Sequence, residues 1–233
     1  GLWFENIYAN SFRTDRGQVA VMSGYPAQPV MSIMKLPHKA QTLPSIARSL
    51  QAEGYATTFT YGGDADFTNT VSYLYGTGVE RITDQRDMHF DVAPAQWGYA
   101  DDVVCPLFAR QVEQLAADGR PFFATLLTLS SHEPFDVPYH RLDNKILNAA
   151  AFTDECVARM IDSWRGKPLW DNLLIILVAD HGIGYPEGLE AGSVARQRIP
   201  MLWMGGAVRE PAVIETYASQ SDLAATLLAE MHI

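Results

Sequence analysis

The fold of this chain is indicated most clearly by residues 173–182, which read LLIILVADHG. Residues 173–179 form a continuous apolar run, which is typical of a strand buried on both faces of a sheet. Polar Asp180 and His181 follow at once, and Gly182 allows the backbone to turn away. The stretch therefore predicts a buried strand with chemically active side chains at its carboxyl end.

Similar apolar stretches alternate with helical patterns along the whole chain. Strands are expected at 2–9, 55–61, 122–129, 173–179 and 200–204. Helices are expected at 42–54, 101–117, 146–165 and 219–228, with a short one after the polar residues 10–17. This alternation predicts a single α/β domain over residues 1–233, with a mainly parallel sheet sandwiched by helices. Ligands of such folds bind at the carboxyl ends of the strands.

Composition excludes several classes of protein. With 233 residues and 48% apolar content, the chain can bury a full core, so it is neither disordered nor fibrous. The 17 Lys and Arg against 27 Asp and Glu give a net charge of −10, which argues against a nucleic-acid partner. Two cysteines are too few for a disulfide scaffold, and no apolar run approaches the ~20 residues of a membrane span.

Thr14 lies in the polar stretch NSFRTDRG at residues 10–17, which follows the first strand. At the amino end of a helix its hydroxyl would face unpaired N–H groups, which favour an anionic ester, and a metal would make it a nucleophile. A plain N-cap threonine is the other interpretation. Arg13 and Arg16 could bind an anion beside Thr14, or they could be solvated charges or members of structural ion pairs.

Asp180 and His181 place a carboxylate oxygen and an imidazole nitrogen side by side at a strand end. Such a pair can converge on one divalent cation, and Mn²⁺, Zn²⁺ or Mg²⁺ would suit these donors. In the alternative interpretation, Asp180 caps the next turn and His181 is an ordinary loop histidine.

Two further polar loops follow predicted strands. His132, in SSHEPF at residues 130–135, could contact a substrate oxygen or assist a leaving group, or it could simply pair with Glu133 or the backbone. Tyr61 and Asp64 belong to YGGDAD at residues 61–66, which could shape a substrate pocket or form a tight turn.

Five segments, in this order, resemble the sulfatase-like catalytic domain of the lipoteichoic acid synthase group, in the alkaline phosphatase superfamily, and most of all its Gram-negative relatives. They are residues 11–17, 61–64, 131–135, 178–182 and 219–222. The resemblance implies that Thr14 is the nucleophile, which forms a covalent ester and touches the metal. It also implies that Asp180 and His181 bind that metal, usually Mn²⁺, and that His132 contacts the substrate phosphate.

The resemblance also implies a setting and a reaction. The chain would be the C-terminal part of a longer protein that an upstream segment anchors in the inner membrane, with the catalytic domain in the periplasm. The implied reaction is a metal-dependent phosphoryl-type transfer or hydrolysis on lipid- or glycan-linked phosphodiesters, as in phosphoglycerol transferases. A sulfuric ester hydrolase and a non-catalytic binding module for envelope lipids or glycans are the alternatives.

The sequence departs from the family pattern at three places. The family's first metal ligand is a Glu upstream of the nucleophile, whereas Glu5 lies inside a predicted strand, so we expect the first strand and one ligand to be missing. The His, Trp and Arg that surround glycerol phosphate in the synthases correspond here to Tyr61, Thr68 and Thr70. The Cys-x-Pro-x-Arg signature of formylglycine sulfatases is absent around Thr14.

Overall fold

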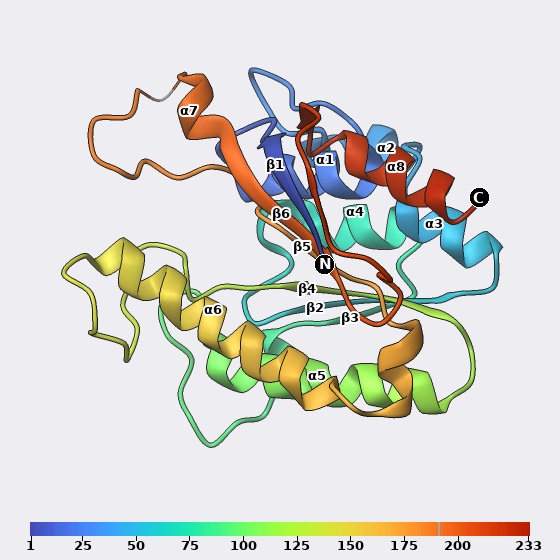
Figure 1. Ribbon diagram of the computed structural model, residues 1–233. Coiled ribbons are helices and arrows are strands. Elements are labelled where there is room, and N and C mark those ends of the chain that lie inside the picture. The colour runs from blue at the N-terminus through green and yellow to red at the C-terminus, as the bar shows by residue number, and fades with distance from the viewer. Residues whose placement is uncertain (191) are drawn as a thin grey trace. The chain divides into compact units, whose positions relative to one another are not determined.

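The computed structural model describes residues 1–190 and 192–233 (Figure 1). The chain divides into two units. Unit 1 comprises residues 1–52, 68–78 and 168–233, and unit 2 comprises residues 53–67 and 79–167. In the part of the chain that the structure describes, no helix is long and apolar enough to cross a membrane.

Unit 1 is built on a mixed sheet in which β1 is central. Its strands are β1 (Leu2–Tyr8), β5 (Ile175–Val178), β6 (Arg198–Met204), β7 (Ala212–Ile214) and β8 (Ala218–Ser219). The strand order is β5-β6-β1-β7, and β8 also pairs with β1. β6 runs antiparallel to both of its neighbours, whereas β7 and β8 run parallel to β1. The carboxyl ends of β1, β5 and β8 therefore point in the same direction.

Unit 1 also contains six helices among the described residues. They are α1 (Thr14–Ser23), α2 (Pro37–Ala40), α3 (Ile46–Ala52), α4 (Thr70–Gly76), α7 (Val194–Gln197) and α8 (Asp222–Glu230), with 3₁₀ turns η1 (Ile33–Lys35) and η4 (Pro168–Asn172). Figure 1 shows α1, α3 and α8 side by side. Their apolar faces bury Val19, Leu50 and Leu223. Helix α1 ends where Gly24 adopts a left-handed conformation (φ 62°), which glycine tolerates without strain.

Unit 2 has a parallel sheet with the order β3-β2-β4, packed against two long helices. Its elements are β2 (Ala56–Tyr61), β3 (Arg81–Thr83), β4 (Phe122–Leu127), α5 (Asp101–Ala117), α6 (Lys145–Trp164) and the 3₁₀ turn η3 (Gln85–Asp87), while η2 (Phe67–Asn69) spans the boundary between the units. Helices α5 and α6 lie side by side (Figure 1), and Phe108 meets Trp164 across their interface at a ring distance of 6.4 Å. Central β2 is buried along five of its six residues.

The predicted α/β class is confirmed, and four of the six strand pairings among the described residues are parallel. The helix expected at 101–117 has those bounds. The expected burial of the strands at 122–129 and 173–179 was wrong, because β4 and β5 are edge strands of their sheets and their side chains are only half-buried. The helix expected at 42–54 begins later, at Ile46, because the Ser45 hydroxyl accepts a hydrogen bond from the Arg48 N–H at 3.0 Å.

Candidate functional site

The ends of β1, β5 and β8 are joined by hydrogen bonds at one end of unit 1. The buried side chain of Gln220 accepts a hydrogen bond from the Asn10 N–H at 2.6 Å and donates one to the Asp180 carbonyl at 3.0 Å. The Gln220 backbone N–H donates to the Tyr8 carbonyl at 2.9 Å, and the Asn10 side-chain amide donates to the Ser219 hydroxyl at 2.6 Å. The loops that carry Thr14 and Asp180 therefore start from one connected junction.

Thr14 is the first residue of α1. The N-cap is Arg13, in extended conformation, and no side chain caps this helix start, so Thr14 is not the N-cap threonine of the simpler interpretation. The carbonyl of Arg13 accepts from the N–H groups of Arg16 and Gly17 at 3.1 and 3.0 Å. Within residues 1–190 and 192–233, the half-buried Thr14 side chain makes no hydrogen bond that would occupy its hydroxyl. It lies at the positive end of the helix dipole.

Gly17 brings the first turn of α1 against Asp180. A Cβ atom placed on Gly17 would lie 2.0 Å from the Asp180 carbonyl oxygen and 3.1 Å from its Cα. Because Thr14 precedes Gly17 by three residues, the two share one face of the helix, less than one turn apart, or about 5 Å along the axis. The structure therefore places Thr14 and the Asp180–His181 pair at the same end of unit 1.

Asp180 and His181 turn their polar atoms toward each other. The Asp180 Oδ2 and His181 Nε2 atoms are 3.5 Å apart, and both side chains are about 30% exposed. Two donors bound to one cation at about 2.1 Å would lie about 3.0–3.4 Å apart, which is close to this spacing. The His181 Nδ1 atom lies 2.9 Å from the Gly182 carbonyl. A proton on Nδ1, donated to that carbonyl, leaves Nε2 free as a ligand, as is common at metal sites.

Asp180 and His181 could supply two ligands to a divalent cation, but among the described residues no third carboxylate or histidine joins them. Among the described residues, no group of three or more His, Cys, Asp or Glu side chains could hold a metal. Glu5 is not a third ligand here, since its carboxylate lies 3.8 Å from Arg198 on β6. The Asp180 Oδ1 atom also accepts from the His181 backbone N–H at 3.0 Å, as a turn-capping aspartate does.

Gly182 is required by a close approach of the backbone. A Cβ atom at this position would lie 1.7 Å from the Arg196 carbonyl oxygen. Any side chain would therefore force the segment after His181 away from α7. The sequence predicted a glycine that lets the backbone turn, and the structure adds the reason, which is lack of space beside Arg196.

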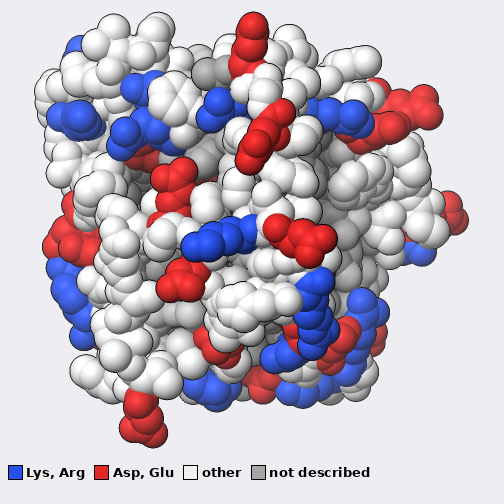
Figure 2. Space-filling view, turned by 90° about the vertical axis from the view of Figure 1, so that its left-hand side faces the viewer, with Lys and Arg blue, Asp and Glu red and all other residues white. Residues whose placement is uncertain are grey.

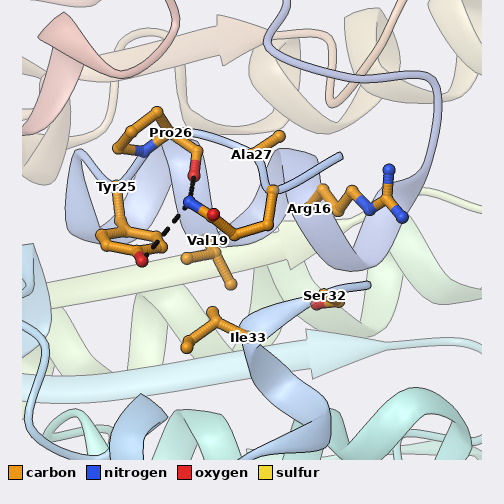
Figure 3. A pocket seen from close by; sticks show the side chains of 8 residues that line it. Arg16, Val19, Tyr25, Pro26, Ala27, Ser32 and Ile33 are labelled. Carbon is orange, nitrogen blue, oxygen red and sulfur yellow. Dashed lines mark hydrogen bonds between the residues drawn. The ribbon is translucent and has the colours of Figure 1, made fainter. Parts of the chain in front are cut away.

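Arg13 and Arg16 each contact a side chain close by in the sequence. The Arg13 Nε atom donates to the buried Asp15 carboxylate at 3.3 Å. The Arg16 guanidinium lies 5.8 Å from the centre of the Phe12 ring. Arg16 also lines a small pocket with Val19 and six other residues (Figure 3), whose volume of about 10 Å³ leaves room for at most about one water molecule. Anion binding by the two arginines stays a prediction.

His132 lies in unit 2, in an exposed loop after β4, with an aromatic residue beside it. The His132 Nδ1 atom lies 2.8 Å from the Glu133 carbonyl, and its ring meets the edge of Trp97 at 5.2 Å. Trp97 is 41% exposed and in turn lies 6.2 Å from the Phe67 ring. Nothing in the local sequence pattern around Trp97 indicates this contact with His132.

Tyr61 is the last residue of β2, and Asp64 begins a tight turn that the Phe67 N–H closes on the Asp64 carbonyl at 3.2 Å. A Cβ atom on Gly63 would lie 2.6 Å from the Tyr61 ring, so the ring covers this glycine. The Asp64 carboxylate accepts from the Asp66 N–H at 2.9 Å, as in an Asx turn. The structure thus supplies the turn that the simpler interpretation required, and substrate contact by these side chains stays a prediction.

A residue that the sequence reasoning missed, Asp84, fixes the loop after Tyr61. Its buried carboxylate accepts hydrogen bonds from the Ala65 N–H at 3.2 Å and from the Arg86 guanidinium at 2.6 Å. Burial raises the pKa of Asp84, but the hydrogen bonds from Arg86 and Ala65 outweigh it, so the pKa lies below the ordinary value. The ionised form therefore stabilises this loop.

Thr68 and Thr70, the predicted counterparts of the family's Trp and Arg, lie in unit 1. Their hydroxyl oxygens are 3.4 Å apart, and Thr68 adopts a left-handed conformation (φ 61°). Thr14, Asp180 and His181 are thus together in unit 1, whereas the approach of His132, Tyr61 and Asp64 to them stays a prediction.

Charged residues of both signs are interspersed on the face in Figure 2, with wide uncharged areas between them. The acidic excess of the whole chain is therefore not gathered into one patch on this face. An anionic substrate would have to be bound by local donors rather than by a general positive field.

Comparison with known proteins gives a consistent result. A family model described as Sulfatase matches residues 1–233. Phosphoglycerol transferase I of Xanthomonas campestris pv. campestris is 27% identical over 197 residues, which are 77% of this chain and 28% of that protein. Lipoteichoic acid synthase 2 of Bacillus subtilis is 22% identical over 97% of this chain and 38% of its own length. The chain therefore spans about a third of these relatives.

A solved structure shows the same fold. The crystal structure of a protein in the alkaline phosphatase superfamily from Vibrio parahaemolyticus aligns with a TM-score of 0.89 at 28% identity, over 100% of this chain and 58% of that one. The predicted resemblance to the lipoteichoic acid synthase group and to the alkaline phosphatase superfamily is confirmed by these matches.

Proposed function

We propose that this chain, which belongs to the sulfatase family, carries the catalytic residues of a metal-dependent phosphoryl-type transferase or hydrolase. The observation that supports the proposal is the packing of Gly17, three residues after Thr14, on the backbone of Asp180. The relatives are phosphoglycerol transferases and lipoteichoic acid synthases, so we propose envelope lipid or glycan phosphodiesters as substrates.

Asp180, His181 and Thr14 are the residues that we propose to hold a divalent cation. Proteins of this superfamily typically use a divalent metal. Mn²⁺ is the ion that we favour, with Mg²⁺ or Zn²⁺ as alternatives, because oxygen and imidazole donors suit all three. When bound, such a cation supplies positive charge that lowers the pKa of a nearby hydroxyl and offsets phosphate charge. The carbonyl contact at His181 Nδ1 supports this role, because it leaves Nε2 available.

In the first step the Thr14 oxygen attacks the phosphorus of a phosphodiester. The Thr14 hydroxyl gives up its proton to solvent as a bond forms between its oxygen and phosphorus. The bond from phosphorus to the leaving oxygen breaks, and the leaving group takes a proton from solvent and departs as an alcohol. The N–H groups at the start of α1 face the anionic ester that results. We propose that His132 contacts the substrate phosphate, and that Arg13, Arg16, Tyr61 and Asp64 contact the rest of the substrate.

In the second step an acceptor hydroxyl or water attacks the Thr14 ester. The new oxygen–phosphorus bond forms, the bond to Thr14 breaks, and the threonine oxygen regains a proton. With an alcohol acceptor the enzyme is a transferase, and with water it is a hydrolase. The half-buried position of Thr14 supports the two-step route, because the hydroxyl is accessible but is not used as a helix cap.

We also propose the cellular setting. The relatives include a lipoteichoic acid synthase, and this chain spans 38% of its length. A single catalytic domain over residues 1–233, held in the periplasm by a membrane segment elsewhere in a longer protein, is consistent with that match. Protease accessibility of the domain in intact spheroplasts tests this location, because a cytoplasmic domain would stay protected.

A sulfuric ester hydrolase is the second candidate, because the matching family model is described as Sulfatase. The sequence favours phosphorus, since threonine cannot be converted to formylglycine. Side-by-side assays with an aryl sulfate and an aryl phosphodiester separate the two. Turnover of the sulfate alone would favour the second candidate.

Substitution of Thr14 tests the proposed nucleophile. Thr14→Val keeps the shape of the side chain and removes the hydroxyl, so we expect turnover of the aryl phosphodiester by the Mn²⁺-loaded full-length protein to be lost. Thr14→Ser keeps a hydroxyl and should retain measurable turnover. Equal melting temperatures of the two variants provide the folding control. Unchanged turnover in Thr14→Val would exclude the mechanism.

A further inference from the structure

Gln220 belongs to the stretch SQSD at residues 219–222, in which Ser219 and Asp222 form a turn. The Asp222 carboxylate accepts from the Ser219 N–H at 2.8 Å and thereby fixes the start of α8. The Gln220 side chain takes no part in this turn. It is fully buried, with 0% of its surface exposed, and its partners lie about 40 and 210 positions away along the sequence.

The Gln220 amide connects two strand ends through oriented hydrogen bonds. Its oxygen accepts from the Asn10 N–H at 2.6 Å, and its nitrogen donates to the Asp180 carbonyl at 3.0 Å and to the Ala179 carbonyl at 3.4 Å. An N–H can only donate and a carbonyl can only accept, so these three partners fix which way the amide faces. A side chain without both a donor and an acceptor at this reach cannot replace it.

Both ends of this connection lead to the proposed site. Asn10 is four residues before Thr14, and Asp180 is a proposed ligand. The Asp180 carbonyl oxygen is contacted from two directions, by the Gln220 amide and by the Gly17 backbone of α1. The position of the Asp180–His181 pair relative to Thr14 therefore depends on this one amide as well as on the helix.

We infer that Gln220 is a positioning residue, which fixes the spacing between the Thr14 loop and the Asp180–His181 pair. The inference deepens the proposed function and rests on it. Loss of the amide leaves the part-buried Asn10 N–H and Asp180 carbonyl without this partner, so both segments gain freedom to separate. The side chain does not touch the substrate and is not a catalytic residue.

Gln220→Met tests the inference, because methionine has a similar size and shape but cannot replace the amide. The matched control is Asn148→Leu in unit 2. The buried Asn148 amide accepts from the Leu142 N–H at 2.9 Å and donates to the Leu142 carbonyl at 2.7 Å. The control therefore also removes an oriented amide pair, but it does so on α6, in a different unit from Thr14 and Asp180.

The first readout is amide hydrogen exchange, measured by mass spectrometry on the metal-free full-length protein. In Gln220→Met we expect hydrogen exchange about tenfold faster, or more, in peptides that cover residues 10–17 and 179–182. The reason is that the Asn10 N–H has lost its acceptor, and the segment after β5 has lost the hydrogen bond to the Asp180 carbonyl. Asn148→Leu should leave both peptides unchanged. Unchanged exchange in Gln220→Met would overturn the inference, whatever the metal does.

The second readout is Mn²⁺ affinity, measured by the electron paramagnetic resonance of free Mn²⁺. Loss of a residue that orients a ligand costs about 10–100-fold in affinity, so we expect Gln220→Met to weaken binding by at least tenfold and Asn148→Leu by less than twofold. Equal weakening in both variants would contradict a positioning role. If the parent protein binds no Mn²⁺, the proposed metal site fails, while the exchange result still decides the inference.

A milder variant covers the case in which Gln220→Met does not fold. Gln220→Asn keeps the amide but is one methylene shorter, so it cannot reach Asn10 and Asp180 together. We therefore expect faster hydrogen exchange in only one of the two segments, either residues 10–17 or residues 179–182. Slow exchange at both segments in a folded Gln220→Asn protein would also overturn the inference.

Discussion

The substitution Gly17→Ala should damage the site far more than it damages the fold. Gly17 lies in the first turn of α1, three residues after Thr14, and its Cα faces the backbone of Asp180. A Cβ atom on Gly17 would lie 2.0 Å from the Asp180 carbonyl oxygen, whereas real Cβ atoms keep at least 3.0 Å from such neighbours. The helix and the Asp180 segment must therefore move apart by about 1 Å or more.

The two consequences differ in size. Overpacking of this kind costs about 1–3 kcal/mol in unfolding free energy, but alanine is favoured over glycine inside a helix by about 1 kcal/mol, so the net loss is about 0–2 kcal/mol. A misplacement of about 1 Å between a nucleophile and its partners costs on the order of 100-fold in rate. Activity should therefore fall by a factor that the small stability change cannot explain.

The assay compares turnover of an aryl phosphodiester with urea unfolding for the same full-length preparations. Gly192→Ala is the matched control, because no atom lies within 4 Å of a Cβ placed there and its φ is not left-handed. We expect Gly17→Ala to keep its fold at 25 °C and to lose about 100-fold in kcat, and Gly192→Ala to retain both. Full activity in a folded Gly17→Ala protein would refute the reasoning.

Two more predictions concern groups in unit 2. The pKa of Asp84 is lowered in the folded protein, so its contribution is present above the unfolded pKa of about 3.9 and is lost as pH falls through the folded pKa. Asp84→Asn should therefore lower the unfolding free energy by about 1–3 kcal/mol at pH 7 and by less at pH 3. Urea titrations at both pH values measure the two losses, and equal losses would contradict this prediction. Burial raises the pKa of the Cys156 thiol to about 12 and that of Cys105 further, so at pH 8 only about 1 in 10⁴ Cys156 thiols is ionised. Alkylation by iodoacetamide should be at least about 1,000-fold slower in the folded than in the denatured protein, and similar rates would show that the thiols are accessible.

Local patterns predicted the longer elements because their signals lie within a few residues. The helix at 101–117 combines acidic residues in its first turn with apolar residues at helical spacing, and it has the predicted bounds. The short strands β3, β7 and β8 have two or three residues each, too few for a periodic pattern. The antiparallel direction of β6 depends on where the chain returns to the sheet, which no local pattern records.

The candidate site was predictable in its residue types but not in its contacts. Asp180 and His181 follow an apolar strand, so their place at a strand end could be inferred from position alone. Gln220 reaches Asn10 across 210 residues, and Asp84 reaches Ala65 across 19, so both roles depend on tertiary structure. The partners of Arg13 and Arg16 show the same limit, because an arginine beside Thr14 can face an anion or an internal group.

The most direct test of the account is an anomalous difference map at the manganese edge, from crystals of the protein grown with Mn²⁺. The account predicts one peak that lies within about 2.0–2.4 Å of the Asp180 carboxylate, the His181 Nε2 atom and the Thr14 hydroxyl. A peak at another place, or a Thr14 hydroxyl that lies far from an ion bound by Asp180 and His181, would contradict it.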